Sequence, residues 1–357
     1  MSNTRTEPTR AVIAGLCAGD AITWSGWWHR LAQLPPRREV RLSEAWEHNR
    51  SLPSSSLPTP YLQASPPSAI DPAGPTDDAE WFVVAVRHHL RQGLDGSTME
   101  GGQDVWAELA GQRSSDPDAV RARLGTVIAL ENITAGRRPP VSGRENPHYF
   151  DDIVCVRAVA AGLLRPGDPH AAADLAEDEA VSTHALDGVH GARGTAALIA
   201  ALVAGSSPEQ GIAAATAQLP AGSWCGHVVA ECLAAATTGT TLDLAAHLER
   251  DIVDHVYAYA NQAPETLGIL LAHLRVARSA EDLMLGALAH PRHADALVPL
   301  AGAVAGAVFG SPVSDAGLPV LGGVSVRALA GVLLDDVLAD ITQHIGAQPG
   351  DRPGGQE

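Results

Sequence analysis

The sequence predicts an all-α protein folded as a single-domain bundle of helices. Hydrophobic residues make up 45% of the chain, but aromatic residues only 4%, so the apolar content is mostly Ala, Leu and Val. Small aliphatic side chains suit the packing of helix on helix better than a β-sandwich, which uses more aromatic and β-branched residues. Apolar and polar residues almost nowhere alternate as they do in a strand. A chain of 357 residues can bury a sizeable core.

The expected helices follow one another along the whole chain, most of them bounded by Gly, Pro, Ser or Asp. A small, apolar helix over residues 9–21 comes first, and a Ser- and Pro-rich loop over residues 52–75 leads into a helix at 81–90. Further helices are expected at 103–111, 117–135, 151–164, 171–185, 192–205, 208–218, 227–236, 242–259, 264–276, 279–290, 295–309 and 324–345. Residues 1–10 are expected to form a flexible N-terminus and residues 347–357 a disordered tail, which leaves 11–346 as the helical domain.

The charge and the cysteines exclude several classes of protein. With 24 basic and 41 acidic residues the net charge is −17, which repels phosphate backbones and argues against duplex nucleic acid as a partner. The four cysteines form no CxxC pair, so reduced, buried thiols are expected. The polar N-terminus lacks a signal-peptide pattern, and the apolar run at 297–309 is too short to cross a bilayer. We expect a soluble, cytoplasmic protein with no membrane contact.

Thr76, Asp77 and Asp78 form the motif with the most direct chemical meaning. Two adjacent carboxylates beside a hydroxyl supply the hard oxygen ligands that Mg²⁺ or Mn²⁺ prefers. Thr76 is expected to cap the following helix, with both acids in its first turn, where the positive end of the helix dipole favours carboxylates. Solvated acids at a helix start are the alternative interpretation.

A second acidic motif lies near the C-terminus, in the stretch His293-Ala294-Asp295-Ala296. Behind it, Gly302, Gly306 and Gly310 recur every four residues and are therefore expected on one helix face. Glycine on that face would let another backbone approach closely, so that Asp295 is presented rigidly at the helix start.

Taken in order, these motifs resemble the ADP-ribosylglycohydrolase family, which includes the dinitrogenase reductase-activating glycohydrolases. The resemblance runs from about Ala11 to Ile345 and rests on several segments together. They are AGLCAGDA at 14–21, Thr76-Asp77-Asp78, Arg157, Ser182-Thr183-His184, Pro264-Glu265-Thr266-Leu267, and HADALVPLAGAVAGAVFG at 293–310.

The resemblance implies an orthogonal, all-α bundle that holds two Mg²⁺ ions and cleaves an ADP-ribose glycosidic bond. In this chain it assigns a catalytic role to Asp77 and Asp78. Metal binding would involve Thr76, Asp77, Asp78, Asp295 and His293. Such ions orient the ribose diol and polarise the sugar, and a carboxylate takes the proton of the attacking water.

Three departures from the family pattern change the expected use of metal. His293 stands where the family has an aspartate, Ala296 where it has a threonine ligand, and the register expected to hold a glutamate contains Trp24 to His29. Loss of carboxylates weakens Mg²⁺ binding severely, so we expect one ion of Mg²⁺ or Mn²⁺ in preference to two. Binding of no ion at all is the remaining alternative. A coordinating His293 would favour a softer ion such as Mn²⁺, Fe²⁺ or Zn²⁺; a helix-start histidine is the alternative.

The expected substrate contacts come from the residues that differ most in size from the family pattern, and from its Thr-His and arginine positions. The segment 146–152, NPHYFDD, replaces a small Gly-Asn-Gly stretch with bulky and acidic residues. Aromatic rings there and in the tryptophan segment could stack on a base, although tryptophans are as often core residues. The candidates are Tyr149, Asp152, Arg157, His184, Trp27 and Trp28.

Three functions remain open from the sequence. The first is a hydrolase of an N- or O-glycosidic bond in an ADP-ribosyl, ribosyl-nucleotide or nucleoside substrate, a small metabolite being favoured slightly over an ADP-ribosylated protein. The second is a non-catalytic protein that binds ADP-ribose or a nucleotide. The third is a metal-independent glycosidase that uses two carboxylates, one with a raised pKa.

Overall fold

The computed structural model describes the backbone of residues 3–31, 74–92, 104–237, 239–256, 261–290, 292–310 and 317–346, with side chains in the first range from residue 6 to 23. Within these ranges the chain forms helices and three isolated β-bridges, and no strand. The predicted all-α class is confirmed. The helices are α1 (Asn3–Leu31), α3 (Asp77–Gln92), α4 (Val105–Ser115), α5 (Leu124–Thr134), α6 (Val141–Arg144), α7 (Ile153–Leu164), α8 (Pro169–Ala180), α9 (Asp187–Val203), α10 (Pro208–Thr216), α11 (Trp224–Ala235), α12 (Thr241–Asp251), α13 (Ala263–Val276), α14 (Ala280–Leu288), α15 (Ala294–Phe309), the 3₁₀ turn η3 (Arg327–Leu329) and α16 (Leu334–Gly346).

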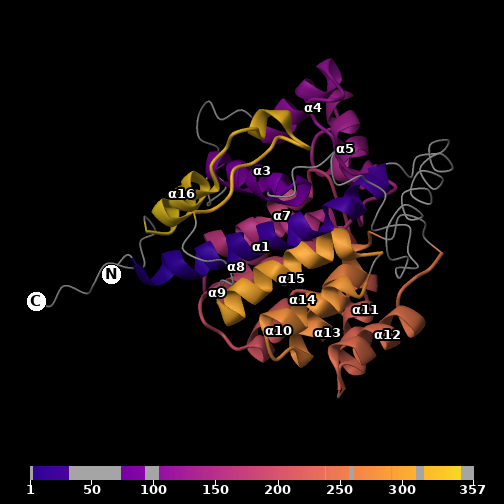
Figure 1. Cartoon of the computed structure of the whole chain (residues 1–357). Helices are drawn as coiled ribbons and strands as arrows, with labels where there is room; N and C mark the ends of the chain where they lie inside the picture. Colours follow the sequence, from indigo (N-terminus) through magenta and orange to yellow (C-terminus); the bar gives the residue numbers. More distant parts are fainter. Residues whose placement is uncertain are drawn as a thin grey trace, which may run out of the picture.

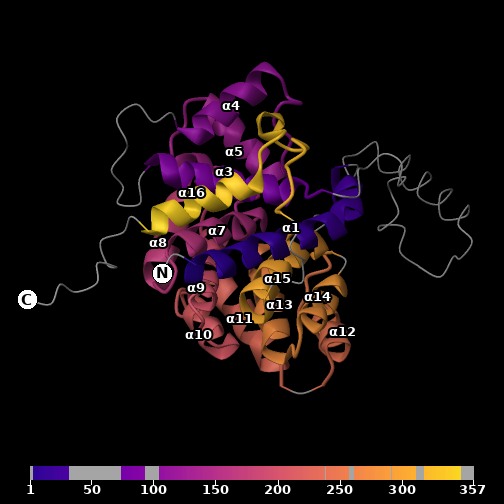
Figure 2. The same ribbon diagram turned by 60° about the vertical axis from the view of Figure 1, so that its left-hand side comes forward.

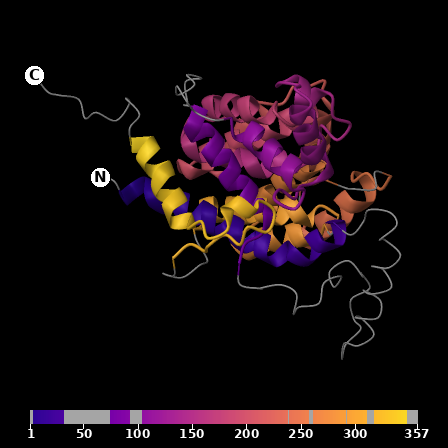
Figure 3. The same cartoon turned by 90° about the horizontal axis from the view of Figure 1, so that it is seen from above.

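Helices α1 and α15 pack antiparallel and lie side by side although they come from opposite ends of the chain (Figure 1). Helices α4 and α5 project at one end of the molecule, and α10 to α14 gather at the other (Figure 2). Seen from above, α1 and α16 lie along one side, with the helices of the middle of the chain on the other (Figure 3). The first and last thirds of the chain therefore share one core.

Helix α7 forms the centre of that core. Every residue from Ile153 to Leu164 is buried, and the helix packs against α3, α8 and α9. A helix that is apolar on nearly its whole circumference, as α7 is apart from Arg157, is expected to be covered by others on every side. The residue directly before it, Asp152, is consequently delivered to the interior of the bundle.

Glycines allow the close crossing of α1 and α15. A Cβ atom on Gly302 would lie 2.7 Å from the carbonyl carbon of Gly15, and one on Gly306 would lie 2.5 Å from that of Ala11. Both glycines thus meet backbone, as the four-residue spacing predicts. Gly310 does something else: it ends α15 with a φ of 84°, and a Cβ there would meet nothing within 4 Å.

Several helix boundaries differ from the sequence expectation. Helix α1 begins at Asn3, so that it includes most of the segment expected to be a flexible terminus, and Thr9 is buried. Residues 117–123 and 324–333 are not α-helical; a β-bridge between Val120 and Val326 joins these two segments instead. Tertiary pairing has overridden the local helical pattern at both places.

Other expectations concern residues outside the described ranges, or the membrane. Most of the loop expected at 52–75 and the tail expected at 347–357 are not among the described residues. None of the described helices has the length and apolar content needed to span a bilayer.

Candidate functional site

The acidic motif begins α3, as the sequence predicts, but its cap comes from another helix. Asp77 and Asp78 stand in the first turn, and both are buried. Asp20 of α1 accepts hydrogen bonds from the backbone N–H groups of Thr76 (2.6 Å) and Ala79 (3.0 Å), and the Thr76 hydroxyl donates to its other oxygen. A carboxylate 56 residues away thus satisfies the helix N-terminus, a role expected of Thr76.

Asp20, Asp77 and Asp78 form a compact, buried group of carboxylates. One oxygen of each lies within 4.8 Å of the others, so the group could hold a metal ion. Burial, together with the neighbouring Asp77, raises the pKa of Asp20 to about 7, although three donors oppose the shift. Burial and Asp77 also raise the pKa of Asp78 well above its ordinary value. Such crowding of like charges favours a bound proton or cation.

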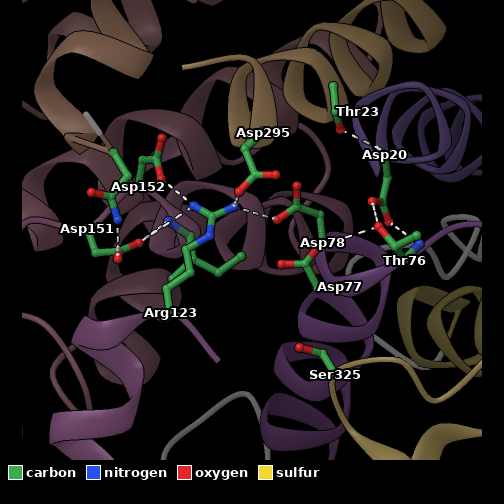
Figure 4. A network of polar contacts seen from close by, with 12 residues as sticks. Asp20, Thr23, Thr76, Asp77, Asp78, Arg123, Asp151, Asp152, Asp295 and Ser325 are labelled. Atoms are coloured by element: carbon green, nitrogen blue, oxygen red, sulfur yellow. Dashed lines mark hydrogen bonds and ion pairs between the residues drawn. The ribbon is translucent and has the colours of Figure 1, made fainter. Parts of the chain in front are cut away.

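A cation from the chain itself lies beside this group (Figure 4): Arg123, the residue before α5. Its Nη2 lies 3.0 Å from Asp78 Oδ1 and 2.8 Å from Asp295 Oδ2. Its Nη1 faces the other way, toward Asp152 and, at 3.6 Å, Asp151. Burial alone would lower the pKa of Arg123, but the carboxylates of Asp152 and Asp78 outweigh it and raise the pKa above its usual value.

The partners of Arg123 are held by further buried contacts. Asp152 accepts a hydrogen bond of 2.8 Å from the Thr266 hydroxyl of α13, and Asp151 accepts one of 2.5 Å from the Asn261 amide. Burial raises the pKa of Asp151 to about 6, against the opposing charge of Arg123. Charge-assisted bonds of this kind fix both members rigidly.

Glu80, in the first turn of α3, holds the segment 324–326, which in turn contacts the segment that carries Arg123. Its carboxylate accepts from the backbone N–H groups of Val324 (2.6 Å), Ser325 (2.8 Å) and Val326 (2.7 Å). Ser325 in turn exchanges hydrogen bonds with the backbone of Arg121, two residues before Arg123. Burial raises the pKa of Glu80 to about 7, although these three donors oppose the shift. The same helix therefore supplies the acids and positions the arginine.

The residues fit one metal ion better than two. The Asp20, Asp77 and Asp78 group has oxygen ligands close enough for one ion, although Asp20 already accepts from three donors. Between Asp78 and Asp295 a second ion would need oxygens at about 2.1 Å, where Arg123 Nη2 already lies. The two cannot share that position, and Ala296 adds no donor atom.

His293, expected as a metal ligand, pairs in this structure with an acid outside the group of Asp20, Asp77 and Asp78. Its Nε2 lies 2.7 Å from Glu265 Oε2 of α13, and the ring is fully buried. The buried acid–histidine group that could hold a metal, among the described residues, does not include it. Its role as a ligand therefore stays a prediction. Thr76 likewise directs its hydroxyl to Asp20.

Arg157 and His184, expected to bind substrate, are both fully buried and pair with internal groups. Arg157 lies 2.8 Å from Glu179 and donates to the Thr183 hydroxyl at 2.6 Å. The Nδ1 of His184 lies 2.7 Å from the same hydroxyl. Their described contacts are those of a buried polar network within α7, α8 and the following turn.

The expected aromatic contacts have mixed outcomes. Tyr149 is half-buried, and its ring meets Phe150 edge-on, 5.1 Å between centroids. Phe150 contacts Trp224 in the same way. Trp27 and Trp28 lie within the last turns of α1, and their side chains fall outside the described part of the chain. Binding of substrate by these residues stays a prediction.

Sequence reasoning missed the arginine at the centre of the site. Arg121 and Arg123 occur in the same short segment, yet Arg121 pairs with the exposed Asp118 while Arg123 reaches the buried acids. No local pattern separates the two. Asp20 could have been predicted as a site residue, because it directly follows the small-residue segment 14–19 of the family motif.

The comparisons with known proteins agree with this architecture. The sequence model described as ADP-ribosylglycohydrolase matches residues 1–339. Among solved structures, the chain is similar to one titled "ADP-ribosylglycohydrolase-related protein complex", with a TM-score of 0.52 and 18% identity over 97% of this chain and 98% of the other. At that identity the likeness concerns the fold alone. Comparison with curated proteins gives no match.

Proposed function

We propose a function from an established premise: the chain belongs to the ADP-ribosylglycohydrolase family. We infer that it is a hydrolase that cleaves the N- or O-glycosidic bond of an ADP-ribosyl or related ribosyl-nucleotide substrate. One observation carries the proposal. Asp78 and Asp295, from opposite ends of the chain, both contact Nη2 of Arg123, beside Asp77. Family membership indicates the reaction class, and the shared contact with Arg123 places these carboxylates close together.

The proposed chemistry is attack of water on the anomeric carbon of the ribose. Asp77 accepts the proton of that water, and Asp78, fixed by Arg123, keeps its neighbour in position. An ion of Mg²⁺ or Mn²⁺, where bound, would be held by Asp20, Asp77 and Asp78 and would act as a Lewis acid toward the sugar. A bond forms between the water oxygen and the anomeric carbon as the bond to the leaving nitrogen or oxygen breaks; the leaving atom takes up a proton from solvent, and Asp77 returns its proton to solvent.

A small ribosyl metabolite is the proposed substrate class, in preference to a modified protein. The support is the bulky segment that contains Tyr149 and Phe150, directly before Asp151 and Asp152, at a place where the family resemblance implies a small Gly-Asn-Gly stretch. These rings would bind a base or a nicotinamide-like ring by stacking. Trp27 and Trp28 are proposed as further contacts of the same kind, and Arg157 and His184 as residues that support the site from within.

A second candidate is a protein that binds ADP-ribose or a nucleotide without cleaving it. It is favoured by the pairing of Arg123 with carboxylates of the kind that hold a divalent ion. In that case the buried acids and arginine serve to shape a binding site.

Turnover of a panel of ribosyl conjugates tests the two candidates. Purified protein is incubated with ADP-ribosyl, ribosyl-nucleotide and nucleoside conjugates, with Mn²⁺, with Mg²⁺ and with a chelator, and release of the base or leaving group is followed by chromatography. The hydrolase should turn over at least one conjugate. Asp77→Ala should reduce the rate by about 100-fold or more, the usual contribution of a general base.

Asp336→Ala is the matched control, because Asp336 is an exposed acid in the first turn of another helix, α16. It should leave the rate unchanged. Binding of nucleotide by calorimetry with no cleavage of any conjugate under any metal condition would favour the binding protein. Cleavage that a chelator leaves unchanged would assign the rate to the carboxylates alone.

A further inference from the structure

Arg123 occupies an unusual place for a surface-type residue. Its side chain is 8% exposed, and it contacts acids from three separate parts of the bundle: Asp78 of α3, Asp152 before α7 and Asp295 of α15. Figure 4 shows the guanidinium between the pair Asp151 and Asp152 on one side and Asp78 and Asp295 on the other. A planar group with forked donors is suited to bridging carboxylates in this way.

The burial of these carboxylates favours a compensating positive charge beside them. The side chains of Asp78, Asp152 and Asp295 are each no more than 2% exposed, and buried carboxylates are costly unless a positive charge or donors compensate them. No other arginine contacts these three acids among the ion pairs of the described residues. Asp152 retains one further donor, the Thr266 hydroxyl. Removal of the guanidinium would leave oxygen ligands of the kind that a divalent ion seeks.

We propose that Arg123 is the resident cation of this site: its Nη2 takes the place of a second divalent ion between Asp78 and Asp295, and replacement of Arg123 by an uncharged residue opens that position to such an ion. The wild-type chain therefore binds at most one divalent ion, at Asp20, Asp77 and Asp78. The proposal concerns which cation the acids hold, so it does not require that the protein turn over any substrate.

The test counts ions bound by the whole chain. Wild type, Arg123→Met and Arg123→Lys are stripped of metal and titrated with Mn²⁺, and free ion is measured by electron paramagnetic resonance. Methionine has a similar length without charge, whereas lysine keeps the positive charge and serves as the matched control. We expect at most one equivalent for wild type and for Arg123→Lys, and one equivalent more than wild type for Arg123→Met.

Thermal unfolding gives a second readout. Arg123→Met should unfold at a lower temperature than wild type. At Mn²⁺ near 100 times the dissociation constant of the new site, its midpoint should recover by on the order of 5 °C more than that of wild type. Adding Asp295→Asn to Arg123→Met should abolish both the extra equivalent and the extra recovery, because the new site loses a carboxylate.

Two results would overturn the proposal. One is a wild-type chain that binds two equivalents of Mn²⁺, a measurement that needs no variant to fold. The other is a folded Arg123→Met protein that binds no more Mn²⁺ than wild type. Absence of turnover on ribosyl conjugates changes neither count, so failure of the proposed hydrolase function and failure of this inference are separable.

Discussion

Replacing Gly302 with alanine should push apart the two helices on which the site depends. A Cβ at this position would lie 2.7 Å from the carbonyl carbon of Gly15 and nearer still to its oxygen, and the atoms it meets are backbone rather than a flexible side chain. Ordinary contact between carbon atoms begins near 3.5 Å, so the helices must separate by at least about 0.8 Å to clear the carbonyl carbon, and by more to clear the oxygen.

The expected cost follows from two opposing effects. Overpacking of this kind costs about 1–3 kcal/mol, and a crossing of two backbones belongs at the upper end because neither side can rotate away. Alanine in place of glycine stabilises a helix by about 1 kcal/mol, which offsets part of this cost. We therefore expect Gly302→Ala to lower the free energy of unfolding by about 2 kcal/mol. Since α1 carries Asp20 and α15 carries Asp295, the substitution should also disturb the cluster around Arg123.

Equilibrium unfolding in urea, followed by far-UV circular dichroism, measures the change. Gly111→Ala is the control: Gly111 also lies within a helix, α4, but a Cβ there meets nothing within 4 Å. That variant should be more stable than wild type by about 0.5–1 kcal/mol. The reasoning is refuted if Gly302→Ala is as stable as wild type, or more so, with the same slope against urea.

Three further predictions concern other buried groups. Arg157→Met should lower the free energy of unfolding by about 3–5 kcal/mol, since it leaves Glu179 buried without its charge partner; a double-mutant cycle with Glu179→Gln should show a smaller loss for the pair than the sum of the singles, and simple additivity would contradict the ion pair. Asp20→Ala should cost about 1–2 kcal/mol of stability in urea unfolding, because the N–H groups of Thr76 and Ala79 lose their acceptor; a loss under 0.5 kcal/mol would rule out that capping role. Burial and the neighbouring His290 lower the pKa of His273 to about 3, so between pH 6.5 and 3 the unfolded chain binds a proton that the folded chain does not. The neutral His273 therefore destabilises the folded chain only below pH 6.5, where the free energy of unfolding declines by about 1.4 kcal/mol per pH unit. His273→Asn should reduce the slope of the unfolding free energy against pH by that amount from pH 6 to 5. Equal slopes for wild type and variant would contradict the lowered pKa.

Helix positions were largely predictable from the sequence because their signals are local. Helix α10 begins at Pro208 after Ser207; in a capping box, the Ser207 hydroxyl accepts from the Gln210 backbone N–H and the Gln210 side chain accepts from the Ser207 backbone N–H. The four-residue spacing of Gly302 and Gly306 identified the face on which a second backbone would pack. Residues three or four apart face the same side of a helix whatever the rest of the chain does, so such patterns survive any tertiary arrangement.

Longer-range pairing overrode these local signals in two segments. Residues 117–123 and 324–333 have helical patterns, yet Val120 pairs with Val326 in a bridge, and Glu80 satisfies three backbone N–H groups at 324–326. Buried backbone N–H groups need acceptors, and here the carboxylate of Glu80 on α3 accepts from three of them at once.

The sequence by itself determined the helical class, the position of Asp77 and Asp78 at a helix start, and the glycine face behind Asp295. Only the tertiary structure decided that Arg123 bridges Asp78 and Asp295, and that His293 pairs with Glu265. The physical reason is that hydrogen bonds within a helix join near neighbours in sequence, whereas a charged side chain takes its partner from whatever the packed bundle brings within reach. The nature of the cation among these acids is therefore a property of the fold.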